Sequence, residues 1–363
     1  MKGMAELTTS INLDRNLSSI LVVRLKALGD IVLSMPLINS LRRTFPDSRI
    51  DYLCFEGYGG ALHGNPDIDR VMEFEKGFFS QAGVMLELRN SRYDLALDLI
   101  SSPRSAVITL FTGADMRIGM DVGRHNFCYH KVLPRTIRRD GNAIKFYTMD
   151  ANREIARILN LEPDNLATPE DRYKTGFPPS EIGREWAEAF LAQAGTEAEG
   201  FIGVVPGAKY QAKGWPAEKF VEFISLVNQR TGYVPVLIWG PGEEDVAGYI
   251  AARTERTLNP PLIGISRLGA LVSMMDCLVG VDSGPKHLAV VQGVPTVTLF
   301  GPTDPLVWDR QSDIHRMIRK DLDCSPCGLT ECPSPECMLG IEADDLFEEM
   351  RRVLREVRQG RIN

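Results

Sequence analysis

The sequence lacks the features that mark several classes of protein. None of its 363 residues lies in a run near the roughly 18 to 20 uninterrupted apolar residues of a membrane helix. Residues 1–19 are polar and lack the apolar core of a secretory signal. Positive charge is not in excess, because 41 Lys and Arg stand against 48 Asp and Glu. The formal charge of −7 disfavours general nucleic-acid binding, and we expect a cytoplasmic protein with no nucleic-acid partner.

Cysteine is scarce and unevenly placed. The count of seven is odd, which does not fit a secreted disulfide framework, and four of the seven lie within residues 324–337. Their spacing allows one tetrahedral zinc, with disulfides and free thiols as alternatives. The cluster follows the turns expected to bind ligand, so any metal here would be structural. The four candidate ligands are Cys324, Cys327, Cys332 and Cys337.

Two series of short apolar strands alternate with helical patterns, separated by a proline-bearing stretch at 161–180. Continuous apolar strands between helices are typical of parallel βαβ units. We predict an α/β protein with a polar extension (1–19), two Rossmann-like doubly wound domains (20–175 and 176–344) and a C-terminal helix (345–363). The predicted strands are 20–24, 50–55 and 93–99 in the first domain and 201–205, 234–239, 277–281 and 296–300 in the second.

The last segment reads as an amphipathic helix over 345–357. Its acidic residues come early and its arginines late, as the helix dipole favours. We expect this helix to return to the first domain. Its apolar stripe consists of Leu346, Phe347, Met350, Val353, Leu354 and Val357.

Ligands of open α/β sheets bind beyond the carboxyl ends of the strands, so the residues that follow each strand are the candidates for a site. The second domain has four such turns, which indicates that it binds one elaborate small ligand. These turns carry Pro206, Gly207, Lys209 and Lys213; Gly240 and Glu244; Asp282, Ser283, Gly284 and His287; and Gly301 and Pro302.

The turn at 282–287 favours an anion site, most plausibly for phosphate. Ser283 is a good N-cap, Pro285 suits a first helical turn, and Gly284 lets a ligand approach the backbone. A helix N-terminus offers free N–H groups, and we expect Lys286 and His287 to add positive charge. A plain capped helix is the alternative.

No glycine turn completes a known nucleotide motif. Gly240-Pro241-Gly242 lacks a third glycine at position 245, and no Walker lysine motif is present. Acidic side chains at the start of the next helix could bind ribose hydroxyls or simply favour the helix dipole. Glu244 is the candidate, with Glu243 as an alternative.

Asp30 is the only carboxylate directly after the first strand. Facing a ligand, it could take a proton from an attacking hydroxyl, and the alternative is that it caps the next helix. Residues 101–140 also carry seven basic residues against three acidic ones. This excess suits an anionic acceptor or a membrane surface, or else a solvated face. The candidate acceptor-binding residues are Lys26, Arg104, Arg117 and Arg124.

Three ordered motifs together resemble the ADP-heptose:lipopolysaccharide heptosyltransferases, glycosyltransferase family 9. They are residues 24–36 (RLKALGDIVLSMP), the pair Pro206-Gly207-Ala208 and Lys213-Gly214-Trp215-Pro216, and residues 282–287 (DSGPKH). The resemblance covers roughly residues 20–345. It implies a GT-B fold, with two Rossmann-like domains facing across a cleft, the acceptor on the first and the nucleotide sugar on the second.

The resemblance also implies a mechanism. Asp30 would be the general base of a metal-independent, inverting transfer from ADP-heptose, or a related nucleotide sugar, to a lipid A-linked core oligosaccharide. Lys213 would neutralise the leaving diphosphate, and the turn at 282–287 would hold the donor, with Glu244 near its ribose. Family members often have a hydroxyl residue near Ala208 or Lys209, and Lys209 could take over its contacts. The enzyme would need no cofactor and would associate peripherally with the cytoplasmic face of the inner membrane.

Two rival functions stay open at this stage. One is a nucleotide-sugar epimerase with two similar domains, which a labelled donor without acceptor would reveal. The other is a non-catalytic nucleotide-binding scaffold, against which the presence of Asp30 beside intact donor turns counts.

Overall fold

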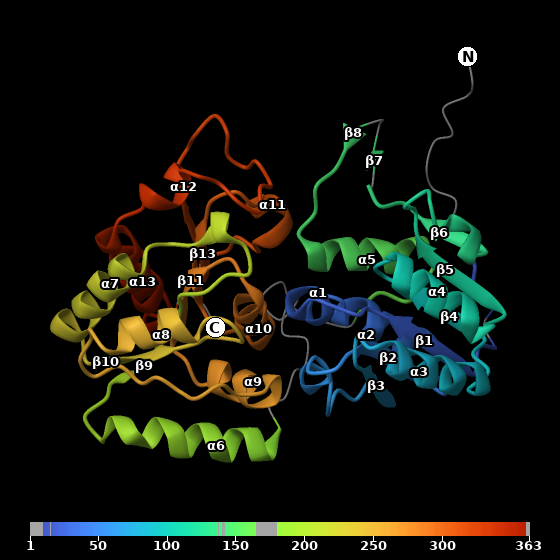
Figure 1. The fold of residues 1–363 in the computed structure, drawn as a ribbon, viewed down its shortest axis with the longest axis horizontal. Helices are drawn as coiled ribbons and strands as arrows, with labels where there is room; N and C mark the ends of the chain where they lie inside the picture. The colour runs from blue at the N-terminus through green and yellow to red at the C-terminus, as the bar shows by residue number, and fades with distance from the viewer. Residues whose placement is uncertain (1–9, 15, 137, 140–141, 165–179, 361–363) are drawn as a thin grey trace. The chain divides into compact units, whose positions relative to one another are not determined.

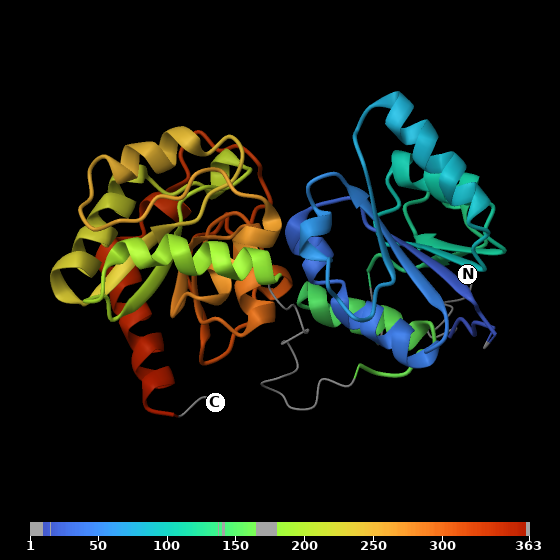
Figure 2. The same ribbon diagram turned by 90° about the horizontal axis from the view of Figure 1, so that it is seen from below.

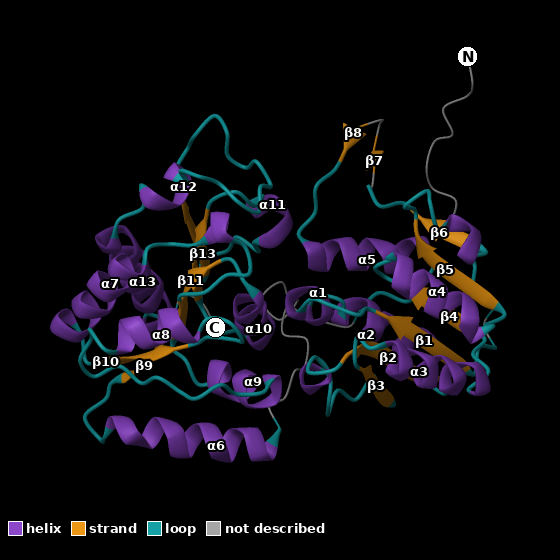
Figure 3. Ribbon diagram, in the orientation of Figure 1, coloured by secondary structure: helices purple, strands orange, loops and turns teal. Residues whose placement is uncertain are grey.

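The structure, a computed structural model, describes residues 10–14, 16–136, 138–139, 142–164 and 180–360. It divides into two compact units, Met1–Asn165 and Leu166–Asn363, and each is a parallel α/β sheet covered by helices (Figures 1 and 3). This confirms the predicted fold class. The predicted boundary at 175/176 and most of the proline-bearing linker lie outside the described residues.

The first unit is built on a six-stranded parallel sheet with the strand order β3-β2-β1-β4-β5-β6. A short antiparallel pair, β7 (Arg138–Arg139) and β8 (Asn142–Ala143), follows the sheet. The six strands are β1 (Ser19–Val23), β2 (Arg49–Phe55), β3 (Arg70–Phe74), β4 (Leu95–Asp98), β5 (Met116–Met120) and β6 (Lys131–Leu133).

Helices cover both faces of this sheet (Figure 2). One face carries α2 (Met35–Thr44) and α5 (Thr148–Ile158), whose apolar side chains share a core with alternate residues of the strands. The other face carries α3 (Phe78–Asn90) and α4 (Pro103–Thr112). Of the N-terminal extension, Ile11, Leu13 and Leu17 pack on the first of these cores. The remaining short helices are α1 (Leu28–Val32), η1 (Gly59–Ala61) and η2 (Asn126–Cys128).

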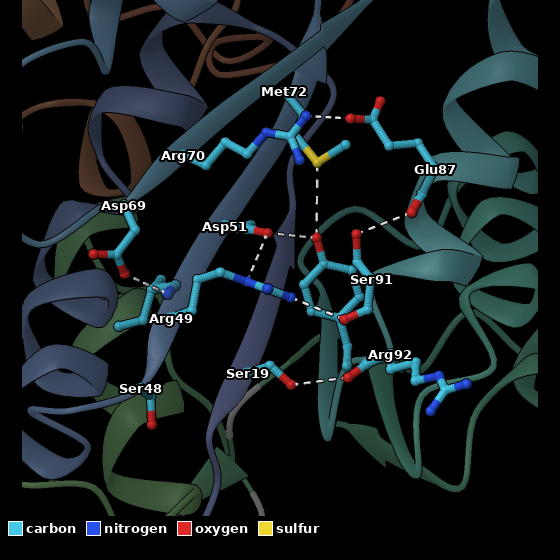
Figure 4. A network of polar contacts seen from close by, with 12 residues as sticks. Ser19, Ser48, Arg49, Asp51, Asp69, Arg70, Met72, Glu87, Ser91 and Arg92 are labelled. Carbon is cyan, nitrogen blue, oxygen red and sulfur yellow. Dashed lines mark hydrogen bonds and ion pairs between the residues drawn. The ribbon is translucent and has the colours of Figure 1, made fainter.

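A polar network ties the amino ends of β1 and β2 to the turn that precedes β4 (Figure 4). The Tyr93 hydroxyl donates to Asp51 at 2.6 Å, and Arg49 lies 3.3 Å from the same carboxylate. Arg49 also donates to the Ser91 carbonyl at 2.9 Å, and the Ser19 hydroxyl to the Arg92 carbonyl at 3.0 Å. These residues lie at the amino ends of the strands. The network therefore holds the strands together at the end of the sheet opposite the carboxyl ends, where the site is expected.

The second unit has a five-stranded parallel sheet with the order β10-β9-β11-β12-β13. Pro235 lies in β10, an edge strand, where its missing N–H costs no inner ladder bond. The strands are β9 (Gly200–Val205), β10 (Tyr233–Leu237), β11 (Cys277–Val281), β12 (Thr296–Phe300) and β13 (His315–Arg319).

Two sets of helices flank this second sheet. The large core on one side includes side chains of α7, α8 and α13, and on the other side α9 packs against α6 and α10. The helices are α6 (Glu181–Leu191), η4 (Ala192–Ala194), η5 (Gln211–Lys213), α7 (Ala217–Arg230), α8 (Glu244–Ala251), α9 (Ile265–Ser273), α10 (Gly284–Gln292), α11 (Pro305–Trp308), α12 (Glu336–Leu339) and α13 (Ala343–Arg358).

The C-terminal helix α13 corrects one expectation. It was predicted to return to the first domain, but its apolar stripe lies in the core of the second unit, against α7 and strands β11 to β13. Leu346, Phe347, Met350 and Val353 are fully buried there. The amphipathic pattern predicts the helix but not its partner, since any apolar surface of matching width would satisfy it.

Besides the short pair β7 and β8, four strands of the two parallel sheets had not been predicted: β3, β5, β6 and β13. Each includes charged residues, and β3, β6 and β13 lie at or next to the sheet edges, where the continuous apolar pattern of inner strands is lost. A search of the described residues finds no helix that combines the length and apolar character needed to span a membrane.

Candidate functional site

Each sheet has a topological switch point, where the chain changes the side on which it adds strands. In the second unit β9 lies between β10 and β11, and in the first unit β1 lies between β2 and β4. Ligands of such sheets bind outside the carboxyl ends of the strands at this point. The turns there carry Gly207 and Asp282 in the second unit and Asp30 in the first.

Asp282 is the centre of the second unit's site. Its buried carboxylate receives hydrogen bonds from the Lys213 ammonium at 2.8 Å and the Thr303 hydroxyl at 3.0 Å, and Lys286 lies at 3.2 Å. Burial alone would raise the pKa of Asp282, but Lys286 and Lys213 hold it well below its usual range. The structure thus brings together Lys213 and Asp282, which the sequence placed in separate motifs, and adds Thr303, which sequence reasoning missed.

The charges of Lys286 and His287 differ from the expectation. The Lys286 ammonium is buried between Asp282 and Asp309, at 3.2 and 3.4 Å, so its charge is balanced inside the unit. Burial, followed by the nearby Lys286, lowers the pKa of His287 to about 3. His287 is therefore neutral near pH 7. Contrary to the expectation, neither Lys286 nor His287 adds net positive charge to the site. Lys213, whose side chain is 17% exposed, reaches the surface of this site.

The N-terminus of α10 presents polar atoms without partners. Ser283 is the N-cap residue as predicted, but its side chain makes no capping hydrogen bond. Within the described residues, Ser283 Oγ and His287 Nδ1 are buried and have no hydrogen-bond partner. Buried polar atoms normally find partners, so their position at a helix N-terminus fits a bound phosphate group. Gly284, the first helical residue, has no side chain to obstruct it.

Glu243 fills the space beside Gly207. A Cβ atom at Gly207 would lie 2.0 Å from the Glu243 carboxyl carbon, so a larger residue at 207 would displace the Glu243 carboxylate. The Glu243 carboxylate accepts a hydrogen bond from the Gly240 N–H at 2.9 Å, and burial raises its pKa. Glu244, the predicted ribose contact, is exposed and accepts from the Gly242 N–H at 2.8 Å. The acidic group between the two glycine turns is therefore Glu243.

Lys209 lies at the surface of the turn that follows β9. It is exposed, and its ammonium lies 5.3 Å from the centre of the Tyr210 ring. The Lys213 ammonium lies 6.0 Å from the same ring. Both ammonium groups thus lie near the Tyr210 ring, which is uncharged and leaves their positive charges in place.

In the first unit, Asp30 lies in the short helix α1 after β1. Its carboxylate pairs with the Arg24 guanidinium and accepts a hydrogen bond from the Ala27 N–H at 3.3 Å, so it also caps α1 as the alternative reading held. Arg24 donates in addition to the Leu99 carbonyl after β4, which links the two strands of the switch point. The Asp30 side chain remains 21% exposed. Arg24 was missed because it ends an apolar strand.

The predicted acceptor-binding residues divide into two groups. Lys26 and Arg124 are exposed, and Arg104 lies over the Phe55 ring at the carboxyl end of β2, at 5.6 Å from its centre. Lys76, missed in the sequence, lies over the same ring at 5.6 Å. Arg117 is a correction: its guanidinium donates to the Cys128 and Ala114 carbonyls, each at 2.9 Å. Those donors hold the fold and are not directed to a ligand.

The four clustered cysteines are free thiols, with Cys324 and Cys327 exposed and Cys337 buried. Burial raises the pKa of Cys337, and the other three thiols raise it further, so all four lie in one region. In the part of the chain that the structure describes, no three His, Cys, Asp or Glu side chains are arranged to hold a metal ion. Structural zinc at these four thiols stays a prediction.

Comparisons with known proteins agree with this geometry. The sequence pattern of glycosyltransferase family 9 (heptosyltransferase) matches residues 83–337. Lipopolysaccharide heptosyltransferase 3 of Escherichia coli is 27% identical over 297 residues, covering 77% of this chain and 82% of that protein.

Two solved structures share the fold over nearly the whole chain. A family 9 glycosyltransferase from Veillonella parvula has a TM-score of 0.79 at 23% identity, covering 96% of this chain and 99% of the other. ADP-heptose lps heptosyltransferase II of E. coli has a TM-score of 0.74 at 22% identity, covering 94% and 99%.

Proposed function

Because the chain belongs to glycosyltransferase family 9, the heptosyltransferase family, we propose that it transfers a heptose from ADP-heptose to the inner core of lipopolysaccharide. The observation that carries this proposal is the cluster at the N-terminus of α10. Lys213 and the unpartnered Ser283 Oγ and His287 Nδ1 meet there at a switch point, as a site for a diphosphate requires.

On the donor side, the diphosphate of ADP-heptose binds at the N-terminus of α10. Its oxygens accept from the backbone N–H groups and from Ser283 Oγ, and His287 is neutral and can donate from Nδ1. Lys213 stabilises the negative charge that develops on the leaving ADP, because Asp282 holds its ammonium at this edge. Glu243, rather than Glu244, accepts hydrogen bonds from the ribose hydroxyls.

On the acceptor side, Asp30 acts as the general base. It takes the proton of the attacking hydroxyl as that oxygen forms a bond to the anomeric carbon and the bond from that carbon to the diphosphate oxygen breaks. Attack opposite the leaving group inverts the anomeric configuration. Arg24 orients the Asp30 carboxylate, and Lys26, Lys76 and Arg104 supply positive charge for an anionic acceptor.

The reaction as proposed needs no cofactor, since Lys213 and the α10 N-terminus supply the positive charge. The acceptor is a lipid A-linked core oligosaccharide, so we place the enzyme in the cytoplasm, peripherally at the inner membrane. Zinc at the four cysteines would be separate from catalysis. Metal analysis of protein purified without chelator tests it.

The decisive experiment offers ADP-heptose, and other nucleotide sugars in parallel, to truncated lipopolysaccharide cores. Transfer of heptose with inversion is expected from the wild-type chain. Asp30→Ala should reduce the rate by at least about a hundredfold while ADP still binds, because general-base catalysis contributes about 10² to 10⁴. Asp47→Asn, which changes an exposed carboxylate of the same unit, is the control.

Three outcomes would contradict the proposal. Asp30→Ala with near wild-type turnover would remove Asp30 as the base. If product forms only from another nucleotide sugar, that sugar and not ADP-heptose is the donor. Conversion of a labelled donor in the absence of acceptor would indicate an epimerase.

A further inference from the structure

Helix α4 of the first unit exposes apolar side chains and buries several hydroxyl residues beside Ala106 and Ile108. A surface helix normally buries its apolar stripe and exposes its polar one. In α4 the hydroxyl residues Ser105, Thr109 and Thr112 are buried, whereas Val107, Leu110 and Phe111 are 41%, 37% and 56% exposed. The buried hydroxyls have partners within the unit: for example, Thr112 donates to the Thr109 carbonyl at 2.7 Å. The outward face of α4 is therefore apolar, and the buried hydroxyl groups on its inner face make hydrogen bonds within the unit.

A second apolar side chain lies beside this helix. Helix η2 contacts α4, and Ala106 of α4 forms a small core with Cys128 and Tyr129. Phe127 lies in η2, directly before Cys128, and its side chain is 78% exposed. We call Val107, Leu110, Phe111 and Phe127 the apolar patch. Single exposed apolar residues are ordinary, but several on adjoining elements mark an interaction surface.

The segment that carries the apolar patch has an excess of positive charge. Residues 103–135 contain five basic residues against two acidic ones. Arg124, Lys131 and Arg135 are exposed, and Arg104 is partly exposed on α4 itself. The acids are Asp115, which is exposed, and Asp121, whose carboxylate accepts from the Asn126 side chain at 2.8 Å. An apolar patch on a basic segment complements a surface that is negatively charged outside and hydrocarbon inside.

We propose that the apolar patch docks this protein on an anionic phospholipid bilayer. Phe111 and Phe127 enter the boundary between headgroups and acyl chains, and Lys131 and Arg135 contact the anionic headgroups. The inference deepens the proposed function, since an acceptor anchored by lipid A lies at such a surface. The patch belongs to the same unit as Asp30, so docking would hold the acceptor-binding unit at the membrane.

The experiment measures co-sedimentation of the purified chain with vesicles, which needs no transfer activity. Vesicles of phosphatidylethanolamine with phosphatidylglycerol are compared with vesicles of phosphatidylcholine alone. The wild-type chain should bind the anionic vesicles, and binding should weaken as salt is raised. Phe111→Ser and Phe127→Ser should each weaken binding by about tenfold, because each removes a large apolar side chain from the boundary.

Two further variants separate the contributions. Lys131→Gln with Arg135→Gln should reduce binding to anionic vesicles and weaken its salt dependence. Ile182→Ser changes a side chain of α6 in the second unit that is 74% exposed, and it should leave binding unchanged. Thermal unfolding of each variant confirms that it is folded, which is expected because the altered side chains are exposed.

Several results would overturn the proposal. It fails if the wild-type chain does not bind anionic vesicles, or if the phenylalanine variants bind as the wild type does. It also fails if the same variants convert a dimer into a monomer without affecting vesicle binding, because the patch would then join two copies of the chain. Vesicle binding without heptose transfer would instead refute the proposed function and leave docking intact.

Discussion

At the scale of single residues, the donor site depends on which acidic and basic groups are buried together. The sequence places Glu243 and Glu244 next to each other, and only the fold distinguishes them. Glu243 contacts Gly207 and Gly240, whereas Glu244 faces solvent at Gly242. A hydrogen-bond acceptor for a ribose needs to lie between the two glycine turns.

We therefore expect Glu243→Gln and Glu244→Gln to differ. The first should weaken ADP binding by about tenfold, since a hydrogen bond to a charged group contributes about 1.5 to 3 kcal/mol. The second should leave the dissociation constant within about twofold. Calorimetric titration with ADP measures both. The reverse order of effects would return the ribose contact to Glu244.

A second residue-scale prediction concerns acid stability. The pKa of His287 is lowered to about 3 in the folded chain, against an ordinary value of about 6.5 in the unfolded chain. Between these values the unfolded state binds more protons, so this residue makes stability fall as the pH falls. Replacement by asparagine removes the effect. As the pH falls below 6.5, the unfolding free energy of His287→Asn should therefore rise relative to that of the wild type, by up to about 1.4 kcal/mol per pH unit.

Urea unfolding at a series of pH values tests this difference. His63→Asn, which replaces an exposed histidine, should run parallel to the wild type. Parallel behaviour of His287→Asn and the wild type would show that the buried imidazole does not titrate as argued.

The sequence predicted part of this site and not the rest, for reasons that are local. Asp30, Lys213 and Asp282 were predicted because they follow predicted strands in recognisable motifs, and the structure brings Lys213 and Asp282 together. Arg24 was missed, since the last residue of an apolar strand gives no signal of its own. The charge expected on His287 was wrong because burial beside a lysine is a property of the fold. Arg117 was misassigned because charge counting cannot show that a guanidinium is held by carbonyls.

At the scale of elements, the second unit depends on a helix from the end of the chain. The stripe on α13 completes the core formed by α7 and the sheet, and the Phe347 ring is fully buried within it. The period of the pattern predicted the helix and its buried face. Its destination required the three-dimensional arrangement, as did the edge strands β3, β6 and β13.

Phe347→Ala should accordingly destabilise the second unit by about 3 to 5 kcal/mol, the usual cost of removing a buried aromatic ring. Arg355→Ala, at an exposed position of the same helix, should change stability by less than about 0.5 kcal/mol. Denaturant unfolding followed by tryptophan fluorescence measures both. A small effect of Phe347→Ala would mean that α13 is not part of this core.

At the scale of the whole molecule, the two units carry different optical probes. All four tryptophans of the sequence, Trp186, Trp215, Trp239 and Trp308, belong to the second unit. Tryptophan fluorescence therefore reports the unfolding of that unit alone, whereas circular dichroism reports both. The fold class of both units followed from alternating strands and helices.

ADP should raise the unfolding midpoint seen by fluorescence, because the proposed donor site lies in the second unit. At a concentration of about 100 times the dissociation constant, the stabilisation should be about 2.7 kcal/mol. Differential scanning with both probes should show a component in circular dichroism that does not respond to ADP. If both components shift together, the units unfold as one.

The placement of α13 has a consequence for how this protein is made. Since the last helix stays with the second unit, each unit is one uninterrupted stretch of the chain, and the chain passes from one to the other a single time. During synthesis all strands and helices of the first unit leave the ribosome before those of the second unit do. The first unit can complete its sheet without waiting for the second, whereas the second unit lacks part of its core until α13 has emerged.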